Sequence, residues 1–367
     1  MSDWKRFLGN CGDSPHPLQF ESIPEPPPWR KFLPHDAVDD NSDRDRWQQL
    51  QVQLQQDRRT AERGRSFRIE ASEIVDAVNA ALYLRRPLLV TGSPGSGKTS
   101  LAYAIAYELQ LGPVLVWPIT ARSTLKDALY RYDAIARLQD AQLDREKLER
   151  LQRQPSNSPP VEDLQEEGRL GDYIQLGPVG TAFLPSHYPR VLLIDEIDKS
   201  DLNLPNDLLN LFEEGEFSIP ELQRRQRKEP RVEVQTEDNL QATVENGRIQ
   251  CCEFPIVVMT SNGERDFPPA FLRRCLRLRM PDPTEESLEE IVKSHFQKDG
   301  SDSWEQIKPQ VRELIQEFLD KENRSDRATD QLLNAIYFIT REAKPNDDTE
   351  WEQLRNILFK RLSQEQS

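Results

Sequence analysis

The sequence predicts an α/β fold: a five-stranded parallel sheet with helices on both faces, followed by a small α-helical lid domain. Three observations lead to this prediction. Five short apolar runs are typical of buried strands, and segments with helical periodicity separate them. A glycine-rich stretch stands between the first run and the next helical segment. After Pro283 the pattern is helical.

The predicted elements alternate along the chain. A helix over residues 71–86 carries Ile74, Val78 and Leu82 at fourfold spacing, and a second helix over residues 99–110 has a similar apolar face. The five runs predicted as strands are residues 87–92, 113–118, 190–195, 255–261 and 276–280.

Two segments interrupt this alternation. Residues 140–168 are charged and have a centre rich in Ser, Asn and Pro, so we expect an insertion there. Residues 231–252 alternate apolar and polar side chains around Asn246-Gly247, which predicts a β-hairpin.

Composition restricts the function classes. The net charge of −15 argues against broad binding to nucleic acids or anionic membranes, although residues 221–231 form a local basic stretch. The four cysteines include no C-x-x-C pair, so neither a zinc site nor a disulfide framework is expected. No apolar stretch approaches the ~20 residues of a membrane span, and the N-terminus lacks the apolar core of a signal peptide. We therefore expect a cytoplasmic protein with no membrane span.

A phosphate-binding loop is predicted at residues 92–99, where GSPGSGKT fits G-x-x-x-x-G-K-[ST] between a strand and a helix. The glycines let backbone N–H groups face phosphate oxygens, and the helix N-terminus adds partial positive charge. Lys98 is placed to reach the β- and γ-phosphates, and the Thr99 hydroxyl suits Mg²⁺. The residues assigned to nucleotide binding are Gly92, Ser93, Pro94, Gly95, Ser96, Gly97, Lys98, Thr99 and Ser100.

Four acids follow the buried run in VLLIDEIDKSD, residues 191–201. A phosphate-binding loop needs a second strand that presents an acid near Mg²⁺, and Asp195 fits this role through a metal-bound water. Glu196 is then placed to polarise a water in line with the γ-phosphate. Asp198 and Asp201 lie beyond the strand, where capping or a solvated turn is expected.

These motifs resemble those of a known family. GSPGSGKTS, LIDEIDKSD, TSNGERD and FPPAFLRRC, in this order and spacing, resemble the AAA+ ATPases, and more narrowly their MoxR-like branch, which is related to dynein-type AAA modules. The resemblance covers residues 70–340, apart from the insertion at 140–168. It implies ATP and Mg²⁺ as cofactors and ATP hydrolysis as the activity.

The resemblance also implies roles for single residues. Asn262 matches the polar sensor that orients the attacking water, although an Asn before Gly is commonly a turn former. Arg274 stands where such proteins carry an arginine finger for a neighbouring subunit, and Arg273 is the adjacent alternative. A surface pair of arginines with no catalytic role is the other interpretation of these two residues. Arg327 matches the lid arginine that contacts nucleotide, but Asp326 replaces the usual proline, which leaves a helix-cap role open.

Three parts are expected along the chain. Residues 1–66 are expected to form a proline- and glutamine-rich N-terminal extension that is partly disordered. Within it, residues 46–65 are predicted to form a solvated linker helix with few apolar residues on one face. Residues 67–282 form the AAA+ α/β nucleotide-binding domain, and residues 283–367 form the helical lid domain.

Assembly and partners follow from the resemblance. A finger that works in trans implies a ring, expected to be a hexamer, that acts on a separate protein partner, for which a von Willebrand A-domain protein is one candidate. Two alternatives remain open at this point. One is an ATP-gated binding scaffold with slow hydrolysis. The other is a P-loop kinase or a DNA-linked P-loop ATPase, whose DNA contact would rest on residues 221–231 alone.

Overall fold

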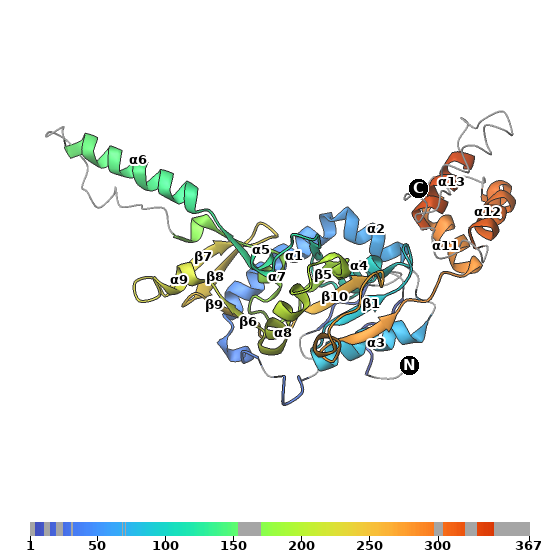
Figure 1. Cartoon of the computed structure of the whole chain (residues 1–367), viewed down its shortest axis with the longest axis horizontal. Helices are drawn as coiled ribbons and strands as arrows, with labels where there is room; N and C mark the ends of the chain where they lie inside the picture. Colours follow the sequence, from blue (N-terminus) through green and yellow to red (C-terminus); the bar gives the residue numbers. More distant parts are fainter. Residues whose placement is uncertain are drawn as a thin grey trace.

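A five-stranded, all-parallel sheet lies at the centre of the computed structural model (Figure 1). The strand order is β11-β1-β10-β5-β2. The strands are β1 (Leu88–Thr91), β2 (Leu115–Pro118), β5 (Val191–Asp195), β10 (Ile256–Ser261) and β11 (Leu276–Arg279). Each lies within one of the apolar runs, so the predicted fold class is confirmed. The structure describes residues 4–10, 15–19, 25–30, 32–67, 69, 71–152, 170–296, 304–319 and 329–340.

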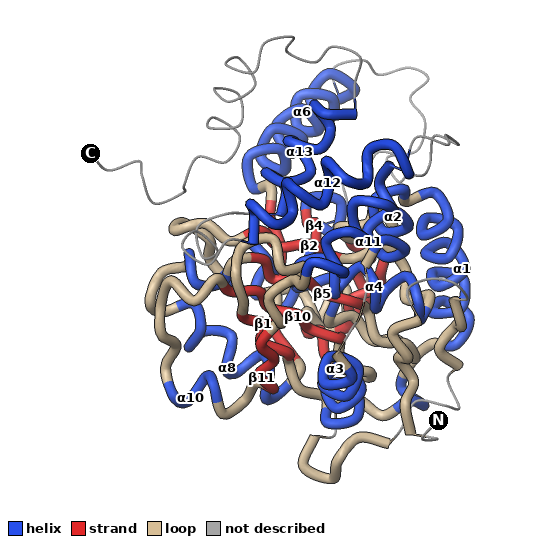
Figure 2. Tube along the Cα trace, turned by 90° about the vertical axis from the view of Figure 1, so that its right-hand side faces the viewer, coloured by secondary structure: helices blue, strands red, loops and turns tan. Residues whose placement is uncertain are grey.

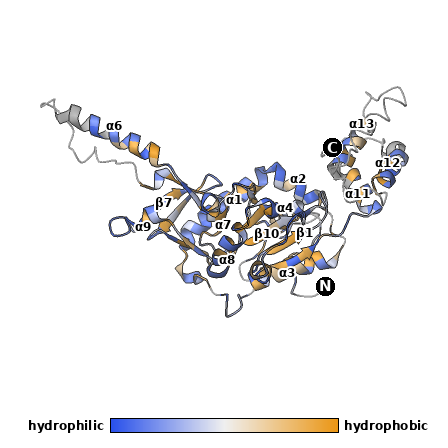
Figure 3. Cartoon of the chain, in the orientation of Figure 1, coloured by the Kyte–Doolittle hydropathy of each residue, from blue (hydrophilic) through white to orange (hydrophobic). Residues whose placement is uncertain are grey.

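Helices cover both faces of this sheet. The covering helices are α3 (Ser72–Leu84), α4 (Lys98–Leu109), α7 (Pro178–Ala182) and α8 (Leu204–Glu214). Leu88 and Val90 of β1 pack with α3 and α4, whereas Leu89 packs with α7 and α8, because successive strand residues point to opposite faces. In Figure 2, α4 and α8 lie on opposite sides of the sheet, and β1 and β10 are mostly hydrophobic in Figure 3.

The helix α4, which follows the phosphate-binding loop, is buried on nearly every side. Its predicted apolar face packs against the sheet. The opposite face of α4 carries Tyr103 and Tyr107 and is covered by α2 (Arg58–Ser66). The two helices approach closely, since a Cβ at Gly64 would lie 2.6 Å from the Tyr107 Cβ. The Arg65 Nε donates a hydrogen bond of 2.6 Å to the Tyr107 hydroxyl. The helix that begins at the loop is therefore held from two sides.

The expectation of a solvated linker helix at residues 46–65 is wrong. This stretch is divided between α1 (Asp40–Gln56) and α2, and both pack on the protein. In α1, Leu50 and Leu54 are 0% and 4% exposed, and the Trp47 side chain packs against the sheet core and stacks on Tyr188. In α2 the guanidinium groups of arginines stack over Tyr103, so charged side chains form much of the contact. A thin apolar pattern therefore underestimates the packing of both helices.

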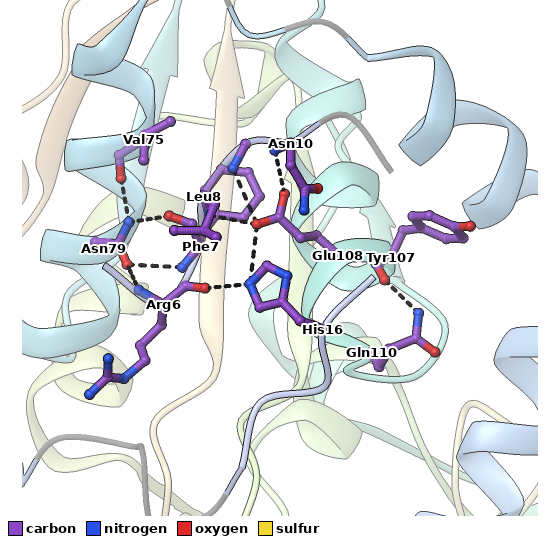
Figure 4. Close-up of polar contacts among 11 residues, drawn as sticks. Arg6, Phe7, Leu8, Asn10, His16, Val75, Asn79, Tyr107, Glu108 and Gln110 are labelled. Carbon is purple, nitrogen blue, oxygen red and sulfur yellow. Dashed lines mark hydrogen bonds and ion pairs between the residues drawn. The ribbon is translucent and has the colours of Figure 1, made fainter. Parts of the chain in front are cut away.

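Residues 4–10 form a strap that lies across α3 and α4 (Figure 4). The buried side chain of Asn79, in α3, binds the strap as a neighbouring strand would. Its Oδ1 accepts hydrogen bonds from the N–H groups of Arg6 at 2.6 Å and Phe7 at 3.0 Å, and its Nδ2 donates to the Phe7 carbonyl at 2.7 Å. The Phe7 side chain is 0% exposed and belongs to the core beneath the strap.

Glu108, in α4, binds the next three amides of the strap. Its carboxylate accepts hydrogen bonds from the N–H groups of Leu8 at 2.5 Å, Gly9 at 3.2 Å and Asn10 at 3.1 Å. Burial raises the pKa of Glu108, and these N–H groups and His16 oppose that shift by stabilising the carboxylate. Described parts of the N-terminal extension are thus built into the protein.

A second, six-stranded sheet has the order β3-β4-β7-β8-β9-β6. Its strands are β3 (Tyr130–Tyr132), β4 (Ile174–Leu176), β6 (Glu216–Ser218), β7 (Arg231–Gln235), β8 (Gln241–Glu245) and β9 (Arg248–Gln250). The predicted hairpin at residues 231–252 is confirmed: β8 and β9 pair around Asn246 and Gly247, whose φ angles are 51° and 66°. β7 also lies within the predicted segment and pairs with β8, whereas β3, β4 and β6 were not predicted from the sequence.

The predicted insertion at residues 140–168 begins as a helix. The helix α6 (Ala134–Gln152) extends away from the body of the protein (Figure 1), and Ile135 and Leu138 on it are exposed. Residues 153–168 lie outside the described part of the chain.

Three helices after the sheet form a core of their own. These are α11 (Glu285–Phe296), α12 (Trp304–Leu319) and α13 (Thr329–Thr340). Their buried side chains form a cluster separate from both sheet cores, which agrees with the predicted helical region. The division of the chain at residues 66 and 282 stays a prediction. Among the described helices, none is long and apolar enough to cross a membrane.

The strap offers a test of this packing. Replacing Asn79 by Ala leaves the amides of Arg6 and Phe7 without their partner, so we expect Asn79→Ala to lower the free energy of unfolding by about 1–3 kcal/mol. Asp76→Ala, also in α3, removes only a half-exposed ion pair with Lys5, and a change of at most about 1 kcal/mol is expected. Urea unfolding followed by circular dichroism measures both. Equal changes for the two variants would contradict the role of Asn79.

Candidate active site

The predicted phosphate-binding loop, residues 92–99, connects β1 to α4 at the carboxyl edge of the parallel sheet. Gly95 and Gly97 have φ angles of 76° and 85°, which side-chain-bearing residues rarely adopt. A Cβ at Gly97 would also lie 2.8 Å from the Phe67 ring, so this position requires glycine for space as well as for conformation. Glycine is therefore required at the positions where the sequence pattern has it, and phosphate binding by this loop stays a prediction.

Lys98 is the first residue of α4 and is only 7% exposed. Its ammonium group donates hydrogen bonds of 2.8 Å to the carbonyls of Gly92 and Ser93 in the loop. Burial lowers the pKa of Lys98, and nearby carboxylates oppose this effect, with Asp198 the strongest among them. The lysine is thus held inside the loop, close to a group of acids.

Asp195 ends β5 and joins three elements of the fold. Its Oδ1 accepts hydrogen bonds from the Thr99 hydroxyl of α4 at 2.9 Å and from the Thr260 hydroxyl of β10 at 2.7 Å. The Thr99 and Asp195 oxygens are hard ligands of the kind that Mg²⁺ prefers. The donor set at this edge of the sheet therefore fits a magnesium ion.

Glu196 follows Asp195 in a left-handed conformation, with a φ angle of 61°. Its N–H donates to the Thr260 hydroxyl at 2.8 Å, so one side chain fixes both acids of the pair. The Glu196 carboxylate pairs with Lys199 at 2.7 Å and accepts a long hydrogen bond of 3.4 Å from the Asn262 side chain. The hydrogen bond that Lys199 donates to Glu196 raises the pKa of Lys199.

The two remaining acids of the motif differ from each other. Asp198 is 5% exposed, and its Oδ2 accepts hydrogen bonds from the N–H groups of Asn262 at 2.9 Å and Glu264 at 3.2 Å. The expectation of a capping or solvated acid is therefore wrong for Asp198, because the turn after β5 directs it inward against the loop after β10. It is confirmed for Asp201, which is exposed and accepts hydrogen bonds from the amides at the start of α8.

The two candidate finger arginines, Arg273 and Arg274, directly follow the short helix α10 (Pro269–Leu272) and precede β11. The Arg274 Nε lies 2.5 Å from the Glu213 Oε1 of α8, and its Nη1 donates to the Ala270 carbonyl at 3.1 Å. The Arg273 side chain is exposed. Arg327, the candidate lid arginine, lies outside the described residues.

Comparison with known proteins places these motifs in a family. The model of the AAA domain, dynein-related subfamily, matches residues 87–275, which is more than half of the 367-residue chain. The chain belongs to this AAA family. Membership implies binding of a nucleoside triphosphate and its hydrolysis, with ATP and Mg²⁺ as the usual pair.

Other comparisons add little to this AAA assignment. Domain III of the replication initiation protein DnaA from Thermotoga maritima is similar at 17% sequence identity and a TM-score of 0.37, over 81% of this chain and 96% of that chain. A likeness at this level carries no argument about function. No curated protein matches the chain.

The AAA site contains two residues that sequence reasoning missed. Thr260 is the penultimate residue of β10, and its position two residues before the predicted sensor Asn262 could have indicated a role. Asp282 accepts a hydrogen bond of 2.9 Å from the Ser93 hydroxyl and so ties the phosphate-binding loop to the start of the C-terminal region. No local sequence pattern predicts this role for Asp282, because its partner Ser93 lies far away along the chain.

Thr260 should be important for stability as well as for the site. It is 1% exposed, and Thr260→Val keeps the shape but removes the partner of the Glu196 N–H and one donor to Asp195. We expect a loss of about 1–3 kcal/mol in the free energy of unfolding. Thr243→Val, on the exposed face of β8, should change it by no more than about 0.5 kcal/mol. Thermal and urea unfolding of the two variants provide the comparison, and a neutral Thr260→Val would refute the role given to this hydroxyl.

Proposed function

We propose that the chain is a MoxR-like AAA+ ATPase that hydrolyses Mg-ATP, assembles as a ring, and remodels a separate protein partner in the cytoplasm. One observation carries the catalytic part. The Thr99 hydroxyl, the Asp195 carboxylate and the Thr260 hydroxyl form one hydrogen-bonded chain across α4, β5 and β10. These hydrogen bonds support a Mg²⁺ site formed by Thr99 and Asp195, beside the loop at residues 92–99 and directly before Glu196.

The loop residues fit a triphosphate. The backbone N–H groups of residues 92–99 and the ammonium of Lys98 would bind phosphate oxygens at the start of α4. The Ser96 hydroxyl is buried without a hydrogen-bond partner among the described residues, so a polar group is also available inside the loop. Thr99, together with Asp195 through a water, would hold Mg²⁺, which neutralises charge on the β- and γ-phosphates when bound.

Glu196 and Asn262 are assigned to the attacking water. The Glu196 carboxylate is 42% exposed and lies at the end of the metal-binding strand, so it can accept a proton from a water at the γ-phosphate. The Asn262 amide approaches the same carboxylate from β10 and can hold that water by a second hydrogen bond. Lys199 forms an exposed ion pair with Glu196, and replacing Lys199 by a water at the Glu196 carboxylate costs little free energy.

ATP binding and ATP hydrolysis can be tested separately by substitution. Glu196→Gln keeps the size of the side chain but removes the base, so we expect kcat to fall by roughly 10²–10⁴ while ATP binding persists. Lys98→Ala should lose binding of a fluorescent ATP analogue. Glu214→Gln, an exposed position at the end of α8, serves as the matched control and should keep wild-type turnover. Near-normal hydrolysis by Glu196→Gln would show that another group activates the water.

The ring is proposed because a finger arginine must enter a neighbouring subunit's site. Arg274 is the first candidate and Arg273 the second. The ion pair of Arg274 with Glu213 does not oppose this role, because both side chains are more than a third exposed and such pairs contribute at most about 1 kcal/mol. Arg274 can therefore exchange Glu213 for a phosphate. A hexamer is the expected assembly.

A finger in trans makes turnover depend on protein concentration. We expect the rate per subunit to rise as the ring assembles and to fall by roughly 10³–10⁵ in Arg274→Ala. Arg277→Ala, an exposed arginine on β11, is the matched control and should be near wild type. Sedimentation velocity gives the assembly state of each variant. A rate per subunit that is independent of concentration would exclude a trans finger, and loss in Arg273→Ala alone would move the role to Arg273.

The partner is proposed to be a separate chain, for which a von Willebrand A-domain protein is the first candidate. Stimulation of turnover by the partner would indicate remodelling, whereas slow, unstimulated hydrolysis would indicate a nucleotide-gated scaffold. The Glu196→Gln variant, which should hold ATP without hydrolysing it, is suited to capture that candidate in a binding assay.

A further inference from the structure

Asp198 occupies an unusual place for a carboxylate. It lies in the single turn Ile197–Lys199, two residues after Glu196, and 95% of its surface is buried. An acid is rarely buried to this extent unless specific partners stabilise it. Its partners therefore indicate what the residue does.

The first partners are two amides from a distant part of the chain. The Oδ2 of Asp198 accepts the N–H of Asn262 at 2.9 Å and the N–H of Glu264 at 3.2 Å. These amides belong to the turn that follows β10. One carboxylate oxygen thus fixes the backbone from which the Asn262 side chain extends.

The second partner is the charge of Lys98. Among the carboxylates that oppose the lowering of the Lys98 pKa by burial, Asp198 acts more strongly than Asp195 or Glu196. The other oxygen, Oδ1, is buried and makes no hydrogen bond among the described residues. Asp198 therefore interacts electrostatically with Lys98 and is hydrogen-bonded to the loop of Asn262.

A further contact joins the same two loops. The Arg265 guanidinium donates to the Ser200 carbonyl at 2.7 Å and to the Ser200 hydroxyl at 3.1 Å. The loop after β5 and the loop after β10 are thus bound to each other at two successive positions. The Asp198 contact is the one nearer to Asn262, so it has the greater control over that side chain.

We propose that Asp198 is a positioning residue for hydrolysis, which holds Asn262 in register with Glu196 so that the amide and the carboxylate meet the same water. This inference rests on the proposed function. The contact between the Asn262 Nδ2 and the Glu196 Oε1 is already long, at 3.4 Å. A small shift of the Asn262 backbone would break it, and misplacement of a catalytic group by about 1 Å can reduce rate by about 10²-fold.

Two substitutions separate the hydrogen bonds of Asp198 from its charge. Asp198→Ala removes both, and we expect kcat to fall by about 10²-fold with KM for ATP changed by no more than about threefold. Asp198→Asn keeps one oxygen that can accept both amides, so its kcat should fall by only about two- to tenfold. Asp201→Asn is the matched control, because asparagine caps a helix as well as aspartate does, and it should be near wild type.

A double-mutant cycle tests whether Asp198 acts through Asn262. If it does, Asp198→Ala combined with Asn262→Ala should reduce kcat no further than Asn262→Ala alone. Multiplied losses, a change confined to KM, or wild-type kcat in Asp198→Ala would each overturn the proposal. If Asp198→Ala does not fold, as judged by thermal unfolding, Asp198→Asn decides in its place: a two- to tenfold loss in kcat supports the proposal and an unchanged kcat overturns it.

The wild-type protein distinguishes this inference from the function on which it rests. If the wild type shows no Mg²⁺-dependent ATP turnover at any concentration, the proposed function fails and the role of Asp198 fails with it. If the wild type turns over and Asp198→Ala equals it, only the role of Asp198 is overturned.

Discussion

The parallel pairing of β5 with β10 is the constraint on which the site depends. The register places Val191 beside Ile256 and Ile194 beside Met259, so that the strands reach the carboxyl edge together. Asp195 and Thr260 are the next residues on each strand, and their hydrogen bond follows from that register. A slip by one residue would turn each side chain to the other face of the sheet, and both the core and the acid pair would be lost.

Local pattern was sufficient for the central sheet and for the phosphate-binding loop. Both faces of that sheet are covered, so its strands read as continuous apolar runs, and glycine, lysine and threonine have few substitutes in the loop. The second sheet was not predictable in the same way. Strands such as β3 and β6 have three residues each, and they are stabilised by pairing with segments far away in the chain.

The acids of VLLIDEIDKSD show the same limit at the level of single residues. The order of residues was enough to locate Asp195 and Glu196 at the sheet edge, because β5 ends at Asp195 and Glu196 follows it directly. It was not enough for Asp198 and Asp201, which are three residues apart and look equivalent in sequence. One is buried against the loop of Asn262 and the other caps α8 in solvent, and only the tertiary contacts separate them.

The strap also bears on what an autonomous folding unit of this protein is. A fragment beginning at residue 67, or at residue 87 where the family match begins, would lack Phe7, whose ring completes the core. It would also leave the carboxylate of Glu108 without its three strap amides in an apolar surrounding. The AAA module defined by sequence similarity therefore omits a segment that contributes to its own core, and expression boundaries should include the strap.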